Sequence, residues 1–283
     1  IAKNGYKIIV PHQKQINEAR LRLLGSTGQI IPVKFQSIKE SKIINLINIA
    51  DVVLNLKTLW DEKKISFEHG IVDFNIDIIK AIKNNKANSQ FIYFSGIGVD
   101  EDIYSLRSRA IYKSEQYIQK NLKNSILIRP GIVMGGDDQF LKGLIPLIKS
   151  SFFIPLFGNG LAKLQPVFID DISIAISKII KKTLLGRHIF EFVGPEIFTY
   201  KELYNYLATC MNKTRVLVPV PFVIAKVGIS VLEKMRLSPL NSEQLKLFEK
   251  NNIASNNYKN LSNLEIKSQD LREIIKKIII KSI

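Results

Sequence analysis

Short apolar runs and segments of helical spacing follow one another through the first half of the chain. The apolar runs have the length of buried strands and lie at 6–10, 29–33, 51–56, 90–95 and 125–129. Between them, apolar residues recur at helical spacing over 13–24, 41–49, 67–83 and 106–120. Strands that alternate with helices predict an α/β fold with a parallel, doubly wound sheet and right-handed crossovers.

The second half is less regular. Helical spacing predicts helices over 141–149, 172–182, 200–211, 222–235 and 271–280 and a strand over 188–193. Thr199 and Glu202 have the spacing of a capping box at the start of the helix over 200–211. We therefore expect a first domain over 1–140 and a smaller, mainly helical lobe over 141–283. The strand and helix near 165–193 are expected to return to the first domain.

Four polar loops follow the predicted strands, after Val10, Leu56, Ser95 and Arg129. In doubly wound sheets, ligands bind outside the carboxyl ends of the strands. These loops are therefore expected to face one common cleft, and the candidate chemistry is sought there.

The first ten residues have the pattern of a helix end, a turn at Gly5 and a strand. In a dinucleotide-binding fold this strand is the second one, so we expect the first strand and its glycine-rich phosphate loop to be absent from the chain. The run GSTG at 25–28 is not such a loop, because it follows a helix and precedes a strand. Two alternatives stay open, a fragment whose loop lies upstream and a protein that lacks the loop.

Composition limits the classes of function. The 283 residues are 46% hydrophobic and carry a net charge of +16, but the lysines are spread along the chain rather than gathered in one stripe. Compositional bias and an anionic partner such as a membrane surface both account for this charge, and nucleic acid is not favoured. One cysteine and three scattered histidines exclude a disulfide framework and have no metal-site spacing.

Eight stretches in order resemble the atypical, extended short-chain dehydrogenase/reductase superfamily. The likeness is greatest to its branch that contains the nucleotide-binding accessory subunit of respiratory complex I and the bacterial homologues of that subunit. The stretches are LGSTGQIIPV (24–33), ADVVLNL (50–56), YFSGIG (93–98), RSRA (107–110), RPGIVMG with DQF (129–140), QPVFIDD (165–171), FVGP (192–195) and VPVPF (218–222). The resemblance implies a Rossmann-like domain and runs to about residue 253.

Active members of this superfamily use a Tyr, a Lys four residues later and a Ser. Ser95 matches the Ser position, although a strand-end cap explains it equally well. No tyrosine has a lysine four residues later; the alignment puts Ser105 at the Tyr position and Arg109 at the Lys position. Tyr104 fits only with a register shift. Ser95, Tyr104 and Arg109 are the catalytic candidates, and we expect no independent catalysis.

The cofactor candidates also come from the resemblance. His12 and Lys14 follow the first strand and suit a 2′-phosphate, which favours NADP(H) over NAD(H). A solvated polar loop explains these two residues equally well. The other candidates lie at family positions near the adenine, the phosphates, the ribose or the nicotinamide, and they are Gln36, Lys57, Thr58, Ser95, Arg109, Pro130, Gly131, Ile132 and Val133. The cofactor is expected to be weakened or lost without the glycine-rich loop.

Two apolar helices with interspersed charges, over 222–235 and 271–280, suit docking on a partner or on an anionic bilayer. Ordinary core helices with a solvated edge are the alternative. The resemblance implies a non-catalytic accessory subunit of respiratory NADH:ubiquinone oxidoreductase, with respiratory subunits as partners. Its place is then the mitochondrial matrix side or the cytoplasmic face of a bacterial inner membrane. The alternatives are an active NAD(P)-dependent reductase or sugar-nucleotide epimerase, and a binding protein in ubiquinone biosynthesis.

Overall fold

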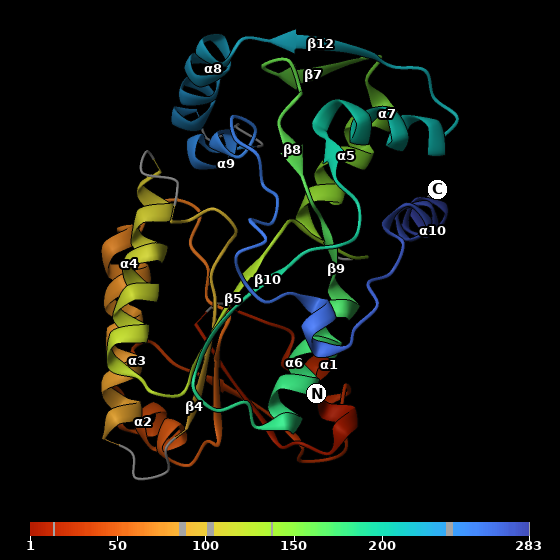
Figure 1. The fold of residues 1–283 in the computed structure, drawn as a ribbon. Helices are drawn as coiled ribbons and strands as arrows, with labels where there is room; N and C mark the ends of the chain where they lie inside the picture. The colour runs from red at the N-terminus through yellow and green to blue at the C-terminus, as the bar shows by residue number, and fades with distance from the viewer. Residues whose placement is uncertain (14, 85–88, 101–104, 137, 236–239, 283) are drawn as a thin grey trace.

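The computed structural model describes residues 1–13, 15–84, 89–100, 105–136, 138–235 and 240–282. Its centre is a four-stranded parallel sheet in the order β10–β5–β4–β3 (Figure 1). The strands are β3 (Val52–Asn55), β4 (Gln90–Phe94), β5 (Ser125–Pro130) and β10 (Arg187–Phe192). The predicted α/β fold with a parallel, Rossmann-like sheet is confirmed.

A second parallel pair lies beside this sheet. It consists of β1 (Ile8–His12) and β2 (Ile30–Lys34), with Ile8 opposite Ile30. Among the described residues, β1 pairs only with β2, and β3 pairs only with β4. The turn at 25–28 joins a helix to β2, as the sequence predicts.

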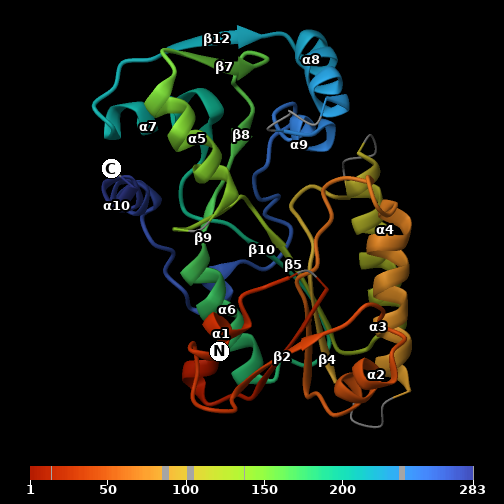
Figure 2. The ribbon, with the colours of Figure 1, turned by 180° about the vertical axis from the view of Figure 1, so that it is seen from behind.

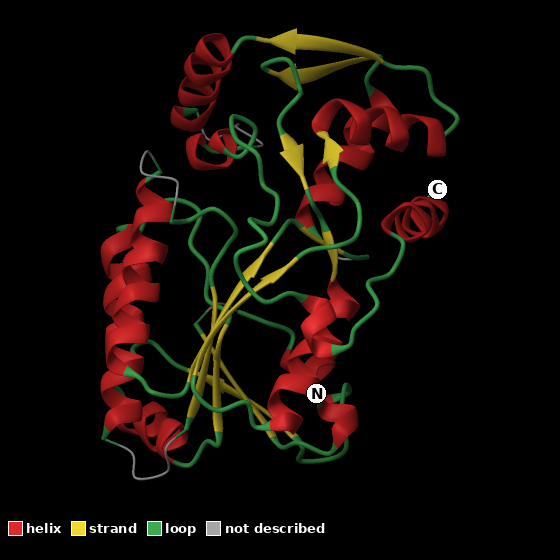
Figure 3. Ribbon diagram, in the orientation of Figure 1, coloured by secondary structure: helices red, strands yellow, loops and turns green. Residues whose placement is uncertain are grey.

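Helices cover both faces of the central sheet (Figure 3). On one face lie α2 (Ser41–Asn48), α3 (Phe74–Lys83) and α4 (Leu106–Asn121), and on the other lies α6 (Ile169–Lys182). Side chains alternate across a strand, so Phe91 and Tyr93 pack against α3 and α4 whereas Ile92 packs against α6. All three are at most 2% exposed, which makes β4 the centre of the core.

The smaller lobe lies at one end of the sheet. It is built on α5 (Gln139–Ser150), α7 (Tyr200–Cys210) and α10 (Leu271–Ser282), which share one apolar core. Its other main elements are β7 (Phe153–Phe157), β12 (Val216–Val220), α8 (Phe222–Lys234) and α9 (Ser242–Lys246). Two short pairs connect the lobe to the sheet, β6 (Val133–Met134) with β9 (Val167–Phe168) and β8 (Lys163–Leu164) with β11 (Phe198–Thr199).

The chain returns to the central sheet near its end. Backbone bridges join Asn252 to Leu164 and Lys259 to Phe190. We call residues 251–260 the strap; they run from the bridge with Leu164 to the bridge with Phe190 of β10, the edge strand of the central sheet (Figure 2). The short helix at Leu261–Leu264 then packs against the α6 face.

The structure corrects several predicted elements. The helix expected over 13–24 is limited to α1 (Glu18–Arg22), which Asn17 caps by accepting a hydrogen bond from the Arg20 amide. The helix expected over 67–83 begins with a π-helical turn, Glu68–Asp73, before α3. The strands β7 and β12 were not predicted, because each contains a proline that masks the strand pattern.

Of the two alternatives for the late helices, α10 has the packing of a core helix with a solvated edge. Its Leu271, Ile275 and Ile279 are at most 1% exposed and pack within the lobe. The Tyr206 hydroxyl on α7 also donates a hydrogen bond to the Arg272 carbonyl. In the described part of the chain, no helix has the length and apolar composition needed to cross a bilayer.

Candidate functional site

The loops after β3, β4 and β5 leave the same edge of the sheet. Direct pairing of the three strands sets Asn55 beside Tyr93, and Phe94 beside Ile128. The sequence-predicted residues Lys57, Thr58, Ser95 and the run 130–133 therefore follow neighbouring strands. Together with the start of α4 they form the candidate site.

Ser95 has a buried hydroxyl at the centre of this edge. Its backbone amide donates to the Ile128 carbonyl at 2.8 Å, which extends the β4–β5 pairing by one residue. Its Oγ atom has no hydrogen-bond partner among the described residues. A buried hydroxyl without a partner loses free energy, so Ser95 is a group that a bound polar ligand would satisfy.

Arg107 orders the loop after β3. Its guanidinium stacks on Trp60 at 3.8 Å and donates to the Leu59 carbonyl at 2.8 Å and to Thr58 Oγ1 at 3.1 Å. Burial lowers the pKa of Arg107 to about 10. Thr58 is therefore held by a neighbouring helix, and its hydroxyl is already an acceptor.

Lys57 lies at the start of the same loop, two residues after the end of β3. Its ammonium is 3.7 Å from the centre of the Phe74 ring, and its amide donates to Asn55 Oδ1. Burial lowers the pKa of the Lys57 ammonium. In turn, Asn55 donates to Asn75 Oδ1 at 2.8 Å within the core, so hydrogen bonds to buried side chains hold the start of this loop.

The residues that were predicted to stand at the family's Tyr and Lys positions lie at the start of α4. Ser105 is 4% exposed and caps this helix by accepting from the Ser108 amide. Its hydroxyl donates to Glu243 Oε2 on α9 at 2.7 Å, and nearby Asn241 donates to the Trp60 carbonyl. Arg109 is exposed, and Tyr104 lies outside the described residues. The smaller lobe therefore touches the main sheet domain at Ser105, the residue predicted to stand at the family's Tyr position.

A buried ionic cluster at the end of β5 was not predicted. Arg129 is 2% exposed and donates to both Glu115 oxygens at 2.9 and 2.6 Å and to Asp100 at 2.7 Å. Tyr258 on the strap covers the guanidinium at 4.8 Å and donates to Asp100. Burial alone would lower the pKa of Arg129, but the hydrogen bonds to Glu115 and Asp100 raise it. The wide separation of these residues in sequence left no short motif to find.

Packing within the protein requires a glycine at position 131. A Cβ atom at this position would lie 2.2 Å from the Gln165 carbonyl oxygen. The segment 130–133 leads directly into β6, which pairs with β9. The run therefore has a structural role in joining the two halves, beside its predicted place near a nicotinamide.

The predicted adenosine side lies after β1 and β2. His12 Nε2 is 3.0 Å from Glu18 Oε1, and Glu18 also binds Arg22. Gln36 is exposed, and its amide donates to Glu40 Oε1 at 2.6 Å. Lys14 lies outside the described residues. The carboxylate of Glu18 was not expected beside His12, because six residues separate them.

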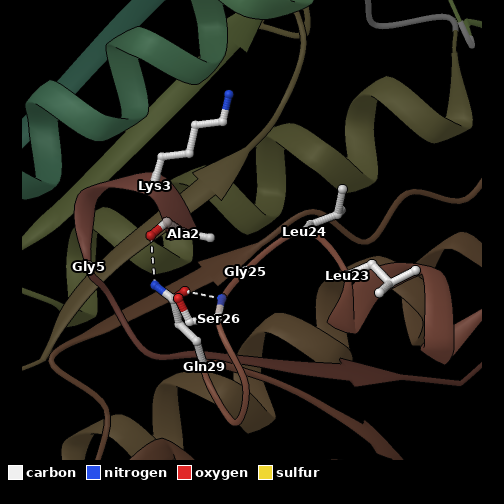
Figure 4. A pocket seen from close by; sticks show the side chains of 8 residues that line it. All are labelled: Ala2, Lys3, Gly5, Leu23, Leu24, Gly25, Ser26 and Gln29. Atoms are coloured by element: carbon white, nitrogen blue, oxygen red, sulfur yellow. Dashed lines mark hydrogen bonds between the residues drawn. The ribbon is translucent and has the colours of Figure 1, made fainter.

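A separate hollow of about 580 Å³ lies among residues 2–5 and 23–29 (Figure 4). Gln29 crosses it, donating to the Ala2 carbonyl and accepting from the Ser26 amide. This hollow is at the amino ends of β1 and β2, the edge opposite the candidate site. Among the described residues, no group of acidic, histidine or cysteine side chains could hold a metal ion.

Several curated proteins are similar in sequence to this chain, although no family profile matches it. The mitochondrial NADH dehydrogenase (ubiquinone) 1 alpha subcomplex subunit 9 of Arabidopsis thaliana is 29% identical over 80% of this chain and 57% of its own length. The rat protein of the same name is 26% identical over 81% and 61%, respectively. The mitochondrial NADH-ubiquinone oxidoreductase 40 kDa subunit of Neurospora crassa is 24% identical over 86% and 64%. The chain thus spans less than two thirds of these relatives.

Solved structures agree on the fold. An NAD complex of dTDP-glucose 4,6-dehydratase from Bacillus anthracis superposes with a TM-score of 0.70 at 15% identity, covering 98% of this chain and 88% of the other. UDP-glucose 4-epimerase from Thermotoga maritima gives 0.66 at 14% identity, covering 98% and 91%. The resemblance seen in the sequence is confirmed: the chain is similar in sequence to the complex I alpha subcomplex subunit 9 proteins and has the fold of the extended short-chain dehydrogenase/reductases.

Proposed function

We propose that the protein is a non-catalytic, nucleotide-binding-type accessory subunit of a respiratory NADH:ubiquinone oxidoreductase. The observation that carries this proposal is the environment of Ser105, at the family's proton-donor position. A serine hydroxyl ionises far less readily than a phenol, and this one is already bonded to Glu243. Arg109, at the Lys position, is an always-charged and exposed group that does not reproduce the Lys role.

The names of the sequence relatives support the proposed partners. Those proteins are named as subunits of mitochondrial NADH dehydrogenase, so the partners we propose are respiratory-complex subunits. The corresponding location is the matrix side of the mitochondrial inner membrane, or the cytoplasmic face in a bacterium. We also propose contact with an anionic membrane surface, through α8 rather than α10.

The proposed cofactor is NADP(H), bound for structure rather than turnover. The Ser95 hydroxyl, which has no partner in the described part of the chain, supports nucleotide binding at this edge, because a ligand hydroxyl or amide would satisfy it. Lys57, Thr58 and the run 130–133 would line the same site, and Gln36 with His12 would lie toward the adenosine. A bound nicotinamide nucleotide would supply hydride chemistry, for which this chain presents no matched proton donor in its described residues.

Glu18 bears on the choice of nucleotide. Its carboxylate, 3.0 Å from His12, would accept a hydrogen bond from a ribose hydroxyl and would repel a 2′-phosphate. Lys14 and His12 would instead favour the phosphate. NADPH and NADH must therefore be compared directly.

Two measurements test the proposed function. The tagged chain, expressed in the organism that encodes it, is expected to copurify with respiratory-complex subunits after mild detergent extraction. Fluorescence titration of the purified chain with NADPH and NADH is expected to show saturable binding without turnover of carbonyl or sugar-nucleotide substrates. Turnover would favour the reductase or epimerase alternative. Purification without any respiratory subunit would overturn the assignment.

A further inference from the structure

Helix α8 carries apolar side chains on two opposite sides. On the inner side, Ala225 and Ile229 are buried and pack against Leu245 of α9. On the outer side, Val223, Val227 and Val231 follow one another at four-residue spacing and are 75%, 62% and 51% exposed. Ile224 and Met235 widen this outer stripe and are also exposed. An amphipathic helix needs one apolar face for its own core, so the outer stripe requires another explanation.

The two-stranded sheet next to α8 continues the exposed apolar area. Phe153 lies opposite Val216 and Pro155 opposite Val218, so these four side chains share one face of the β7–β12 pair. Phe153 is 63% exposed and packs edge-to-face on Phe152, which is also exposed. Figures 1 and 2 both show β12, β7 and α8 at the end of the molecule away from the N-terminus.

We call this area the apical surface. It consists of Phe152, Phe153, Pro155, Val216, Val218, Val223, Ile224, Val227, Val231 and Met235. Singly exposed apolar residues are ordinary on protein surfaces, but a set this large on adjoining elements marks an interaction site.

The charge around the apical surface is mainly positive, although Lys226 of α8 forms an ion pair with Glu249 at 2.7 Å. Residues 139–160 and 211–235, which form this end of the lobe, contain six basic residues and one acidic residue. Arg215, next to Val216, is held by the carbonyls of Ile148, Lys149 and Thr214. These partners are neutral, so its charge is not cancelled there.

We propose that the apical surface docks on an anionic lipid bilayer, with α8 lying in the plane of the interface. A bilayer supplies an apolar layer for the valine stripe and Phe153, and anionic headgroups for the surrounding lysines and arginine. The inference rests on the proposed function only in that a respiratory subunit works beside a membrane. To the membrane contact through α8 proposed above, it adds the exposed face of the β7–β12 pair and the orientation of α8 in the interface.

Vesicle flotation of the purified full chain tests the proposal. Vesicles of phosphatidylcholine with about 30% phosphatidylglycerol are expected to bind the chain, and vesicles of phosphatidylcholine alone are expected to bind it far more weakly. The double variant V227D/V231D is expected to reduce binding by at least about tenfold, because it places two carboxylates on the outer stripe. Since both side chains are exposed, its thermal melting should match that of the unmodified chain.

The control is L23D/L24D. Leu23 and Leu24 are 84% and 62% exposed beside the hollow near the N-terminus, so the same change in charge and polarity occurs at the other end of the molecule. This variant should bind vesicles normally. Equal binding to both kinds of vesicle, or equal loss in both variants, would overturn the proposal.

Light scattering identifies a rival occupant. If the chain forms a dimer that V227D/V231D dissociates, and does not float with vesicles, the apical surface binds a second copy and the lipid proposal fails. Neither measurement uses the respiratory complex. Failure here is therefore distinct from failure to copurify with respiratory subunits.

Discussion

Ser105 and Glu243 are 138 positions apart and share a hydrogen bond of 2.7 Å between Oγ and Oε2. This bond ties the start of α4 in the main sheet domain to α9 in the smaller lobe. Asn241 adds a second tie to the Trp60 carbonyl at 3.0 Å. The arrangement joins the two halves at the residue that was predicted to stand at the family's Tyr position.

Breaking this bond should loosen the contact between the two halves. We expect S105A and E243A each to lower the free energy of unfolding by about 1–2 kcal/mol, because each leaves a buried or partly buried partner unsatisfied. Urea unfolding of both variants and of the double variant gives the coupling energy, which should exceed about 0.5 kcal/mol. E273A, at a well-exposed carboxylate on α10, is the control and should have little effect. Additive effects would contradict a direct interaction.

The Arg129 cluster should be the most sensitive polar feature of the fold. R129M removes the partner of Glu115 and leaves a carboxylate that is 2% exposed without its counter-charge. We expect a loss of about 3–5 kcal/mol in the free energy of unfolding, measured by urea denaturation. The matched control K182A breaks an exposed ion pair with Glu265 and should cost no more than about 1 kcal/mol. Similar losses in the free energy of unfolding of R129M and K182A would show that the buried Arg129 does not stabilise the fold more than an exposed ion pair does.

Ser95 should contribute to nucleotide binding. S95A is expected to weaken NADPH binding by about tenfold, which corresponds to the loss of one hydrogen bond of about 1.4 kcal/mol. S125A is the matched control, because Ser125 also has a buried hydroxyl without a partner among the described residues but lies at the opposite edge of the sheet. Titration by fluorescence should show normal binding for S125A. Equal affinity of S95A and the unmodified chain would remove Ser95 from the site.

Two glycine-to-alanine changes should have opposite signs. G131A forces a Cβ atom against the Gln165 carbonyl, so we expect it to destabilise the fold by about 1–3 kcal/mol. G143A lies within α5, where an added Cβ meets nothing within 4 Å, and should stabilise by about 0.5–1 kcal/mol through higher helix propensity. Thermal melting of the two variants checks both. If G131A left the melting temperature unchanged, the backbone at Gln165 would be able to move away from the added Cβ atom.

Glu40 gives a pH dependence with a defined sign. Hydrogen bonds from the Ser37 and Gln36 amides lower the pKa of the Glu40 carboxyl from 4.5 to about 2. A depressed folded-state pKa contributes stability above about pH 4.5, and this contribution is lost as the pH falls through about 2. E40Q should therefore be less stable than the unmodified chain at neutral pH and equal to it near pH 2. Titration of the Glu40 carboxyl by NMR would show an ordinary midpoint if this loop does not hold it.

The parts of the fold that the sequence predicts are those with strong local patterns. β4 and β5 are continuous apolar runs because both faces of the sheet are covered, so run length alone identifies them. The capping box at Thr199 and Glu202 is present with both of its hydrogen bonds. By contrast, β7 and β12 contain Pro155 and Pro219, and only their mutual pairing makes them strands.

The candidate site was predicted in outline but not in its contacts. Strand order places Lys57, Ser95 and the run 130–133 on one edge, and sequence periodicity is enough for that inference. The Glu243 partner of Ser105 and the Tyr258 ring over Arg129 come from α9 and the strap, more than 100 residues further along. Contacts at such separations depend on tertiary packing, which no local pattern encodes.

The strap has a consequence for how the molecule comes apart. Residues of the main sheet domain occur before 131, again at 167–192 and again at 251–266, and residues of the lobe fill the intervals. A protease cut in any one segment that links the two halves would leave two fragments still held together by the other links. Neither half could be expressed alone as one continuous piece of chain. Because β10 and the strap pair with segments that are far away in sequence, we expect these pairings to form late in folding and the two halves to unfold together.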